Sequence, residues 1–133
     1  GKAVREIALV GLGGSIGAVL RFALSHWAHT ATKIADLPVG TLLVNVLGCL
    51  AIGLVVQLGK TMGLAEAPFR SFLVVGFLGA FTTFSTFSME TVDLFLNGRI
   101  WVAGANVVVN AALCVIGVLL GRGIVLLVTQ RPA

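Results

Sequence analysis

The sequence predicts an all-α membrane protein whose single domain, residues 1–133, crosses the bilayer four times. Apolar residues make up 58% of the chain, charged residues only 11%, and the mean hydropathy is +1.08. A soluble domain has about a quarter of its residues charged. The few charges also cluster, which leaves long uncharged stretches at 7–20, 37–59, 71–89 and 100–121.

The helix positions follow from these stretches. A helix that spans the bilayer needs about 20 mostly apolar residues. Three stretches reach that length, and the first reaches it if the helix continues past Arg21. Pro38 and Pro68 suit helix starts, where a missing N–H costs nothing, and Asn97-Gly98 predicts a turn. We expect helices at about 7–28, 39–59, 69–96 and 100–128.

The basic residues give a net charge of +4 and lie scattered at predicted helix ends, so they form no patch for nucleic acid. Five fall on the side that holds both termini and three on the opposite side, with Arg122 inside the fourth helix left uncounted. This small excess favours a cytoplasmic N-terminus and also permits insertion in both orientations. The first group is Lys2, Arg5, Lys60, Arg70 and Arg131, and the second is Arg21, Lys33 and Arg99.

No motif in the chain predicts an enzyme. Residues 13–17 match the G-x-S-x-G nucleophile elbow, which requires a turn from a strand into a helix. Here the motif lies inside an apolar helical span, where Gly13 and Gly17 have the spacing of close helix packing. We interpret Cys49 and Cys114 as buried, small apolar residues in apolar surroundings, not as a disulfide or a metal site.

The third span is the most informative segment. Residues 76–91 read GFLGAFTTFSTFSMET, and residues 82–91 carry six hydroxyls at a depth where unsatisfied polar groups are costly. Gly76 and Gly79, followed by β-branched Thr82 and Thr83, predict a mid-span break that frees backbone groups for an ion. The alternative is a continuous helix whose hydroxyls bond back to its own carbonyls. We favour an ion path, because the run ends in an intramembrane carboxylate, Glu90.

Phenylalanines recur every third residue through this run, at positions 81, 84 and 87. For Phe81, a core or lipid-facing position is the simpler interpretation. Phe84 and Phe87 lie among hydroxyls and can border a polar path. The edge of an aromatic ring is positive, so ring edges can contact a small anion without a fixed cation that would trap it.

Two other helices carry columns of polar residues spaced by four, which places each column on one helix face. An asparagine amide offers two N–H donors, the groups that replace water around an anion. The alternative is hydrogen bonding that joins the helices, and for Asn106 we leave the choice open. The columns are Thr41, Asn45 and Cys49 on the second helix, and Asn106, Asn110 and Cys114 on the fourth.

Together these segments resemble the Fluc (CrcB) fluoride channel family over nearly the whole chain. The resemblance rests on the Gly-rich first helix with Arg21, on residues 40–45 (GTLLVN) and above all on residues 76–91. It implies an antiparallel, dual-topology homodimer in the bacterial inner (plasma) membrane, with two fluoride pathways lined by both chains. It also implies passive export of cytoplasmic fluoride, and hence fluoride resistance.

The resemblance implies roles for individual residues. Phe84 and Phe87 would be the aromatic-box residues, and Asn45 the pore amide. Asn110 stands where the family has His or another polar residue, so the fourth helix departs from the pattern. The remaining assignments are Thr41, Ser85 and Thr86 to the hydroxyl track, Arg21 to the vestibule, Glu90 to the far end of the path, and the carbonyls of Gly79 and Thr82 to a structural Na⁺ at the dimer centre.

Two other functions stay open. The runner-up is a small four-helix dimeric, proton-coupled exporter of cationic compounds. That chemistry needs a central carboxylate, usually on the first helix, where this chain offers only Glu6 at the edge. A non-conducting assembly subunit would leave the polar run unexplained. A narrow path rich in donors suits fluoride, because fluoride is small and holds its water tightly, whereas chloride is larger and more weakly hydrated.

Overall fold

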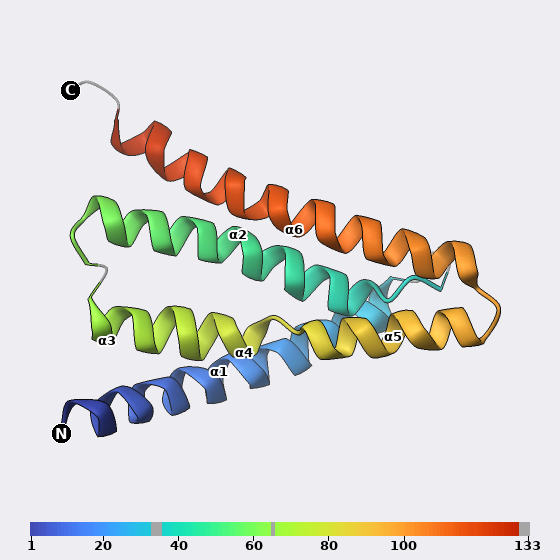
Figure 1. Cartoon of the computed structure of the whole chain (residues 1–133), viewed down its shortest axis with the longest axis horizontal. Helices are drawn as coiled ribbons and strands as arrows, with labels where there is room; N and C mark the ends of the chain where they lie inside the picture. The colour runs from blue at the N-terminus through green and yellow to red at the C-terminus, as the bar shows by residue number, and fades with distance from the viewer. Residues whose placement is uncertain (33–35, 65, 131–133) are drawn as a thin grey trace.

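The computed structural model describes residues 1–32, 36–64 and 66–130, and it contains four helical spans that are long and apolar enough to cross a membrane (Figure 1). The protein is therefore a multi-pass membrane protein. Its elements are α1 (Lys2–Ala31), α2 (Val39–Thr61), α3 (Ala67–Phe69), η1 (Arg70–Leu78), α4 (Gly79–Phe81), α5 (Phe84–Leu96) and α6 (Ile100–Thr129).

The observed bounds lie close to the expected ones, except that α1 begins at Lys2 instead of near residue 7. The chain termini and the connection from α2 to α3 lie at one end of the bundle, and the turn from α5 to α6 lies at the other (Figure 1). Gly98 in that turn has a φ of +80°, which confirms the predicted turn. Lys33 and Arg131, two of the counted charges, lie outside the described residues.

The third span consists of several segments. The π-helix η1 follows the short helix α3 and continues into α4. Thr82 (φ −88°, ψ 155°) and Thr83 (φ −147°, ψ 112°) then have extended backbones before α5 begins. The Thr83 side chain accepts a hydrogen bond from the Thr86 N–H and caps α5. The sequence did not predict the π-helical turns, a geometry often found at functional sites.

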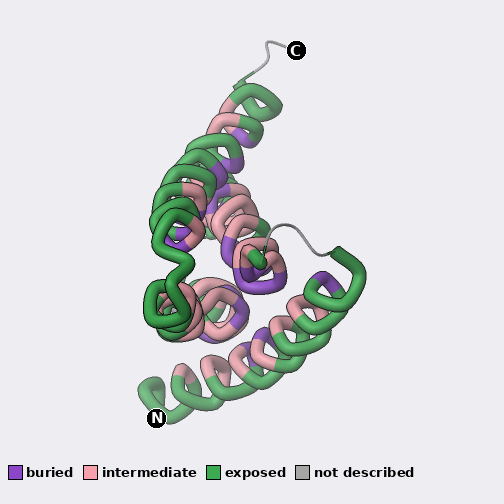
Figure 2. The backbone as a smooth tube through the Cα atoms, turned by 90° about the vertical axis from the view of Figure 1, so that its right-hand side faces the viewer, coloured by how far each residue is buried: buried purple, intermediate pink, exposed green. Residues whose placement is uncertain are grey.

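The helices pack in two close pairs, α1 against η1 and α2 against α6. The N-terminal helix α1 and the C-terminal helix α6 lie on opposite sides of the bundle (Figure 2). A β-carbon at Gly17 would lie 2.1 Å from the carbonyl oxygen of Phe77, and one at Gly121 would lie 2.4 Å from that of Leu50. Gly13 is equally close to η1. The interpretation of residues 13–17 as a packing motif in a helix is therefore confirmed.

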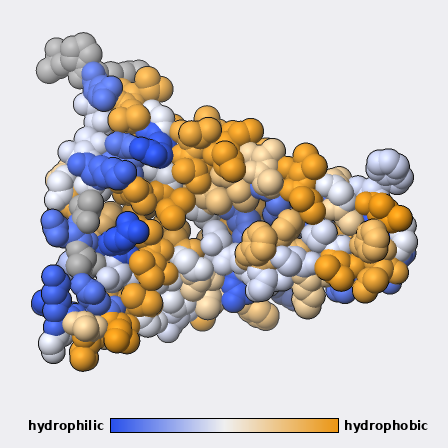
Figure 3. Space-filling model, in the orientation of Figure 1, coloured by the Kyte–Doolittle hydropathy of each residue, from blue (hydrophilic) through white to orange (hydrophobic). Residues whose placement is uncertain are grey.

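The flanks of the bundle are apolar, and hydrophilic residues gather at the end that holds both termini (Figure 3). Many large apolar side chains are exposed, as lipid contact requires. Trp27 and Trp101 are 60% and 91% exposed and lie at the opposite end, near the end of α1 and the start of α6. This position suits interfacial anchors.

Candidate ion pathway

An amide from α2 holds the extended residues between α4 and α5. Asn45 Nδ2 donates to the Thr83 carbonyl oxygen at 3.2 Å, and the Thr83 N–H donates to Asn45 Oδ1 at 2.8 Å. Asn45 is buried. The two bonds satisfy backbone groups that have left the helical pattern at a depth where no water can do so. One N–H of the Asn45 amide remains for another acceptor.

Arg21 supports the same region from α1. Its Nε donates to the Ala80 carbonyl oxygen at 3.0 Å, in the last turn before the extended residues. The side chain is half-buried and therefore turns into the bundle. Because Nε makes this bond, the two terminal nitrogens of the guanidinium can face an anion.

The polar columns of α2 and α6 both hold α5. Thr41, which is buried, donates to Oε1 of Glu90. Asn106 Nδ2 donates to Thr91 Oγ1 at 2.9 Å. For Asn106 this contact favours the interpretation that the amide joins helices, the choice that the sequence left open.

Three hydroxyls of the polar run donate to the backbone carbonyl four residues before them in the same span, so the back-bonding of the alternative interpretation applies to them. These bonds leave the three hydroxyl hydrogens occupied, and the groups contribute to the local backbone instead of facing an ion. The bonds run from Thr82 to Leu78 (3.2 Å), from Ser88 to Phe84 (2.9 Å) and from Thr91 to Phe87 (2.7 Å).

The other hydroxyls are arranged differently. Thr83 Oγ1 donates to Thr86 Oγ1 at 2.9 Å, so the hydroxyl hydrogen of Thr86 is free to point elsewhere. Ser85 is exposed at the start of α5. Thr86 and Ser85 are thus the hydroxyls of the run that are best placed to donate to a ligand.

Two phenylalanines flank these hydroxyls along the chain. Phe84 is 79% exposed, Phe87 is half-buried, and their ring centroids are 5.5 Å apart. We call the exposed surface at the start of α5, formed by Phe84 and Ser85 with Phe87 one turn after Phe84, the open face of α5. Phe81, by contrast, is buried and stacks on Phe77, which confirms its interpretation as a core residue.

A polar cavity of about 260 Å³ lies between α1, α2 and α5. It brings together three residues that the sequence assigned to the path: Thr41, Thr86 and Glu90. The residues that α1 contributes to this cavity were not predicted from the sequence. Their one recognisable feature is a pair of histidines three residues apart. The α1 residues are Phe22, Ser25, His26 and His29, and Gly40 completes the lining.

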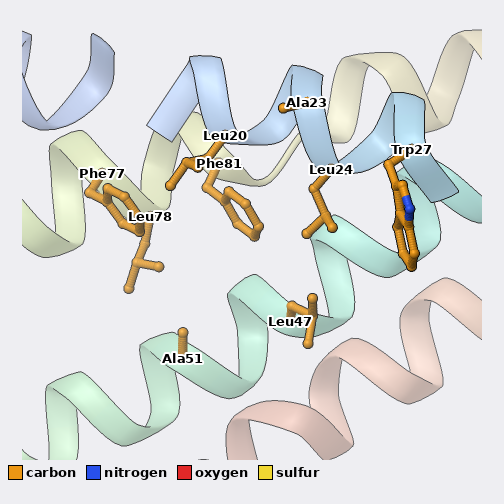
Figure 4. Close-up of a pocket in the computed structure, with 9 residues that line it drawn as sticks. All are labelled: Leu20, Ala23, Leu24, Trp27, Leu47, Ala51, Phe77, Leu78 and Phe81. Atoms are coloured by element: carbon orange, nitrogen blue, oxygen red, sulfur yellow. The ribbon is translucent and has the colours of Figure 1, made fainter. Parts of the chain in front are cut away.

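A larger cavity of about 560 Å³ opens between α1, α2 and the third span (Figure 4). Its lining offers no hydrogen-bond donor for an ion except the indole N–H of Trp27. This apolar lining does not suit an anion. The cavity is lined by Leu20, Ala23, Leu24, Trp27, Leu47, Ala51, Phe77, Leu78 and Phe81.

Comparison with known proteins decides the family. A sequence model of the family described as CrcB-like protein, Camphor Resistance (CrcB), matches residues 8–122, which is most of the chain. The chain belongs to the CrcB family. This confirms the family that residues 76–91 predict.

Relatives of this CrcB-family chain are named as channels. A protein from Shewanella pealeana named fluoride-specific ion channel FluC is 43% identical over 122 residues, which cover 92% of this chain and 97% of the relative. One from Ruminiclostridium cellulolyticum with the same name is 39% identical over 121 residues, 91% and 92% of the two chains. Fluoride-specific ion channel FluC 1 of Methanosarcina acetivorans is 40% identical over 116 residues, 87% of each chain.

The fourth helix of this CrcB-family chain presents an acceptor where a donor was expected. Asn110 Nδ2 donates to both the carbonyl oxygen and Oδ1 of Asn106, each at 2.9 Å. Asn110 Oδ1 is buried and has no hydrogen-bond partner within the described part of the chain. An acceptor does not suit an anion, although a water or a donor from a second chain could fill the position.

The two cysteines are free, as expected, but they are half-buried and are neighbours instead of isolated. Cys114 on α6 and Cys49 on α2 lie near each other, where these two helices pack together. In residues 1–32, 36–64 and 66–130, no group of three His, Cys, Asp or Glu side chains is placed to hold a metal ion.

Proposed function

We propose that this CrcB-family chain forms a fluoride-selective passive ion channel that exports cytoplasmic fluoride across the bacterial inner (plasma) membrane and so gives fluoride resistance. Relatives named fluoride-specific ion channels, 39–43% identical over most of the chain, support this function. The observation that carries the proposal is the open face of α5, where an aromatic side chain, Phe84, and a hydroxyl side chain, Ser85, are both exposed in the middle of a membrane span.

A second copy of the chain completes the path. In one chain, Phe84 is 79% exposed and the Ser85 hydroxyl is exposed beside it. Lipid would leave that hydroxyl without a partner, which is costly in the hydrocarbon. Another copy, inserted antiparallel, would cover this face and present its own open face in return. The homodimer would then contain two equivalent pathways, each lined by both chains, with a break in the third span beside each path.

Fluoride would pass by exchanging its water for donors on the chain. The free hydroxyl hydrogen of Thr86, the remaining N–H of Asn45 and the Ser85 hydroxyl supply hydrogen bonds, and the positive edges of Phe84 and Phe87 supply weaker contacts. None of these groups carries a full charge, so the ion can leave as readily as it enters. Chloride is rejected because it is larger and meets the donors less closely.

The ends of the path have different chemistry. The terminal nitrogens of Arg21 would raise the local concentration of anions at the vestibule without holding one, because Nε is fixed on Ala80. Glu90 would mark the other end, in the polar cavity, where Thr41 donates to one carboxylate oxygen. Net movement follows the electrochemical gradient of fluoride, and the chain needs no proton to carry out transport.

A structural Na⁺ at the dimer centre is part of the proposal, held by the carbonyl oxygens of Gly79 and Thr82 from both copies. The residues fit this role. Gly79 is exposed. Among the described residues, the neighbour found within 4 Å of the position that a β-carbon on Gly79 would take is the Val74 carbonyl oxygen, at 3.6 Å. The backbone of Thr82 is extended, not helical. Carbonyl oxygens are hard ligands suited to alkali cations, and the bound charge would join the two chains.

Fluoride efflux from proteoliposomes tests the function. Vesicles that contain the protein are loaded with potassium fluoride, and valinomycin supplies the counter-current of potassium without a proton gradient. We expect fluoride release at an external electrode and none from matched vesicles loaded with chloride. Release that appears only with an imposed proton gradient would favour the exporter, and no release from well-folded protein would overturn the channel assignment.

A further inference from the structure

Three basic side chains surround the end of α2 at the end of the molecule that holds both termini. We call Lys60, Arg70 and Arg122 the basic collar. Lys60 and Arg70 line one small cavity between the end of α2 and the start of η1. Arg122 reaches the same part of α2 from α6 by contacting Gln57, one turn before Lys60. This is the end at which hydrophilic residues gather (Figure 3).

The Arg122 guanidinium is held in one orientation. Its Nε donates to Gln57 Oε1 at 3.1 Å, and Gln57 is 8% exposed, so the acceptor is fixed within the bundle. Gln57 Nε2 in turn lies 3.4 Å from Thr61 Oγ1. Contact through Nε leaves the two terminal nitrogens, with four N–H donors, available for a planar or tetrahedral anion. Less conformational freedom is then lost when a ligand binds.

The depth of Arg122 matches a lipid headgroup. Trp101, at the start of α6, is 91% exposed and marks one boundary of the membrane. Arg122 follows 21 residues later, a rise of about 32 Å along the helix, and the hydrocarbon core is about 30 Å thick. Arg122 therefore lies at the level of the opposite headgroups, with exposed leucines at positions 119 and 120 facing the acyl chains.

The basic collar has no carboxylate partner in the structure as described. Within residues 1–32, 36–64 and 66–130, the ion pair that forms is between Arg99 and Asp36, which lie at the opposite end of the bundle. Three positive charges, one of them held in place, thus face the membrane surface. We propose that the basic collar binds the phosphodiester headgroup of an anionic phospholipid, with phosphatidylglycerol as the simplest ligand of this class. The proposal is independent of what the channel conducts.

Native mass spectrometry of the full chain in detergent tests the site. Phosphatidylglycerol is titrated against phosphatidylcholine for the unmodified protein and for Arg122→Gln, Lys60→Gln and Gln57→Leu. We expect phosphatidylglycerol to bind in preference to phosphatidylcholine. Arg122→Gln and Lys60→Gln should each weaken its binding about fivefold. Gln57→Leu should weaken it as well, although the net charge is unchanged, because the guanidinium loses its fixed orientation.

Arg5→Gln is the matched control. It removes one positive charge from the same end of the molecule, on α1 and outside the basic collar, and should leave the binding of phosphatidylglycerol unchanged. An equal loss in Arg5→Gln, or no effect of Gln57→Leu, would show attraction by net charge alone and overturn the site. Equal binding of the two lipids would also overturn it. If inorganic phosphate bound the collar as tightly as the lipid, the ligand would be a free ion and the lipid assignment would be wrong.

Discussion

Replacement of Asn45 by leucine tests whether the α2 amide holds Thr83 in its extended conformation. Leucine has nearly the same volume but removes both hydrogen bonds, the one to the Thr83 carbonyl (3.2 Å) and the one from the Thr83 N–H (2.8 Å). An unsatisfied buried backbone group costs about 1–3 kcal/mol, and interhelical hydrogen bonds in membranes average about 0.6 kcal/mol. For the two bonds together we expect Asn45→Leu to lower the free energy of unfolding by about 2 kcal/mol.

The same change should affect fluoride flux. Without Asn45, the Thr83 N–H and carbonyl would find hydrogen-bond partners by becoming helical. Residues 82 and 83 would then join α4 and α5 into one helix. A cost of about 2 kcal/mol shifts the equilibrium between the extended and the helical conformation roughly 30-fold toward the helical one. Fluoride efflux from proteoliposomes should fall by a similar factor, while size-exclusion chromatography still gives a single folded species.

Asn106→Leu is the control for packing. Asn106 is more deeply buried (1% exposed, against 9% for Asn45) and contacts Thr91, but it has no hydrogen bond to the extended residues. We expect a comparable loss of stability with flux retained. Flux of Asn45→Leu equal to that of the unmodified protein would refute the role of Asn45. Equal loss of flux in both variants would assign the effect to general destabilisation.

Three further substitutions test other parts of the account. Phe84→Ile should reduce fluoride efflux at least about tenfold, because aliphatic carbon lacks a positive edge, while the stability of the single chain is unchanged since the ring is exposed; normal flux would limit the ring to packing. Thr41→Val should lower the free energy of unfolding by about 1 kcal/mol and slow flux, because Glu90 loses its donor, and stability and flux equal to wild type would contradict this. Gly17→Ala should destabilise the fold by about 1–3 kcal/mol, because its β-carbon would meet a carbonyl at 2.1 Å. Gly104→Ala, with nothing within 4 Å, should not; equal melting temperatures for the two glycine variants would contradict the packing of α1.

The spans could be predicted because the bilayer imposes them. A chain with long uncharged stretches must form helices of a length set by the hydrocarbon, and only the ends are free to vary. The start of α1 at Lys2 is one such end. The Arg5 N–H donates to the Gly1 carbonyl oxygen, so the helix extends beyond the apolar stretch, where hydropathy does not predict its end. The glycines at 13 and 17 also had a recognisable spacing.

The contacts of the pathway were less predictable. Composition directed attention to residues 82 and 83, which the structure shows to be extended. The side chains that hydrogen-bond to the backbone in and beside these residues depend on how α1 and α2 are rotated against the third span. A single sequence does not contain that information. The bonds from Asn45 to Thr83 and from Arg21 to Ala80 therefore required the structure.

Two pairs of residues show the same limit. His26 and His29 belong to no motif in the sequence, yet they line the polar cavity together with Glu90. Cys49 and Cys114 were interpreted as separate apolar residues, yet the pairing of α2 with α6 makes them neighbours. In both cases a contact between helices brings together residues that have no relation along the chain.

A cryo-electron microscopy map of the protein in a lipid bilayer with fluoride present would test the central claim most directly. We expect the map to show a second, inverted chain against Phe84 and Ser85, with ion-sized density within hydrogen-bond distance of Thr86. A map in which lipid acyl chains cover Phe84 and Ser85, with no second chain and no density beside Thr86, would contradict it.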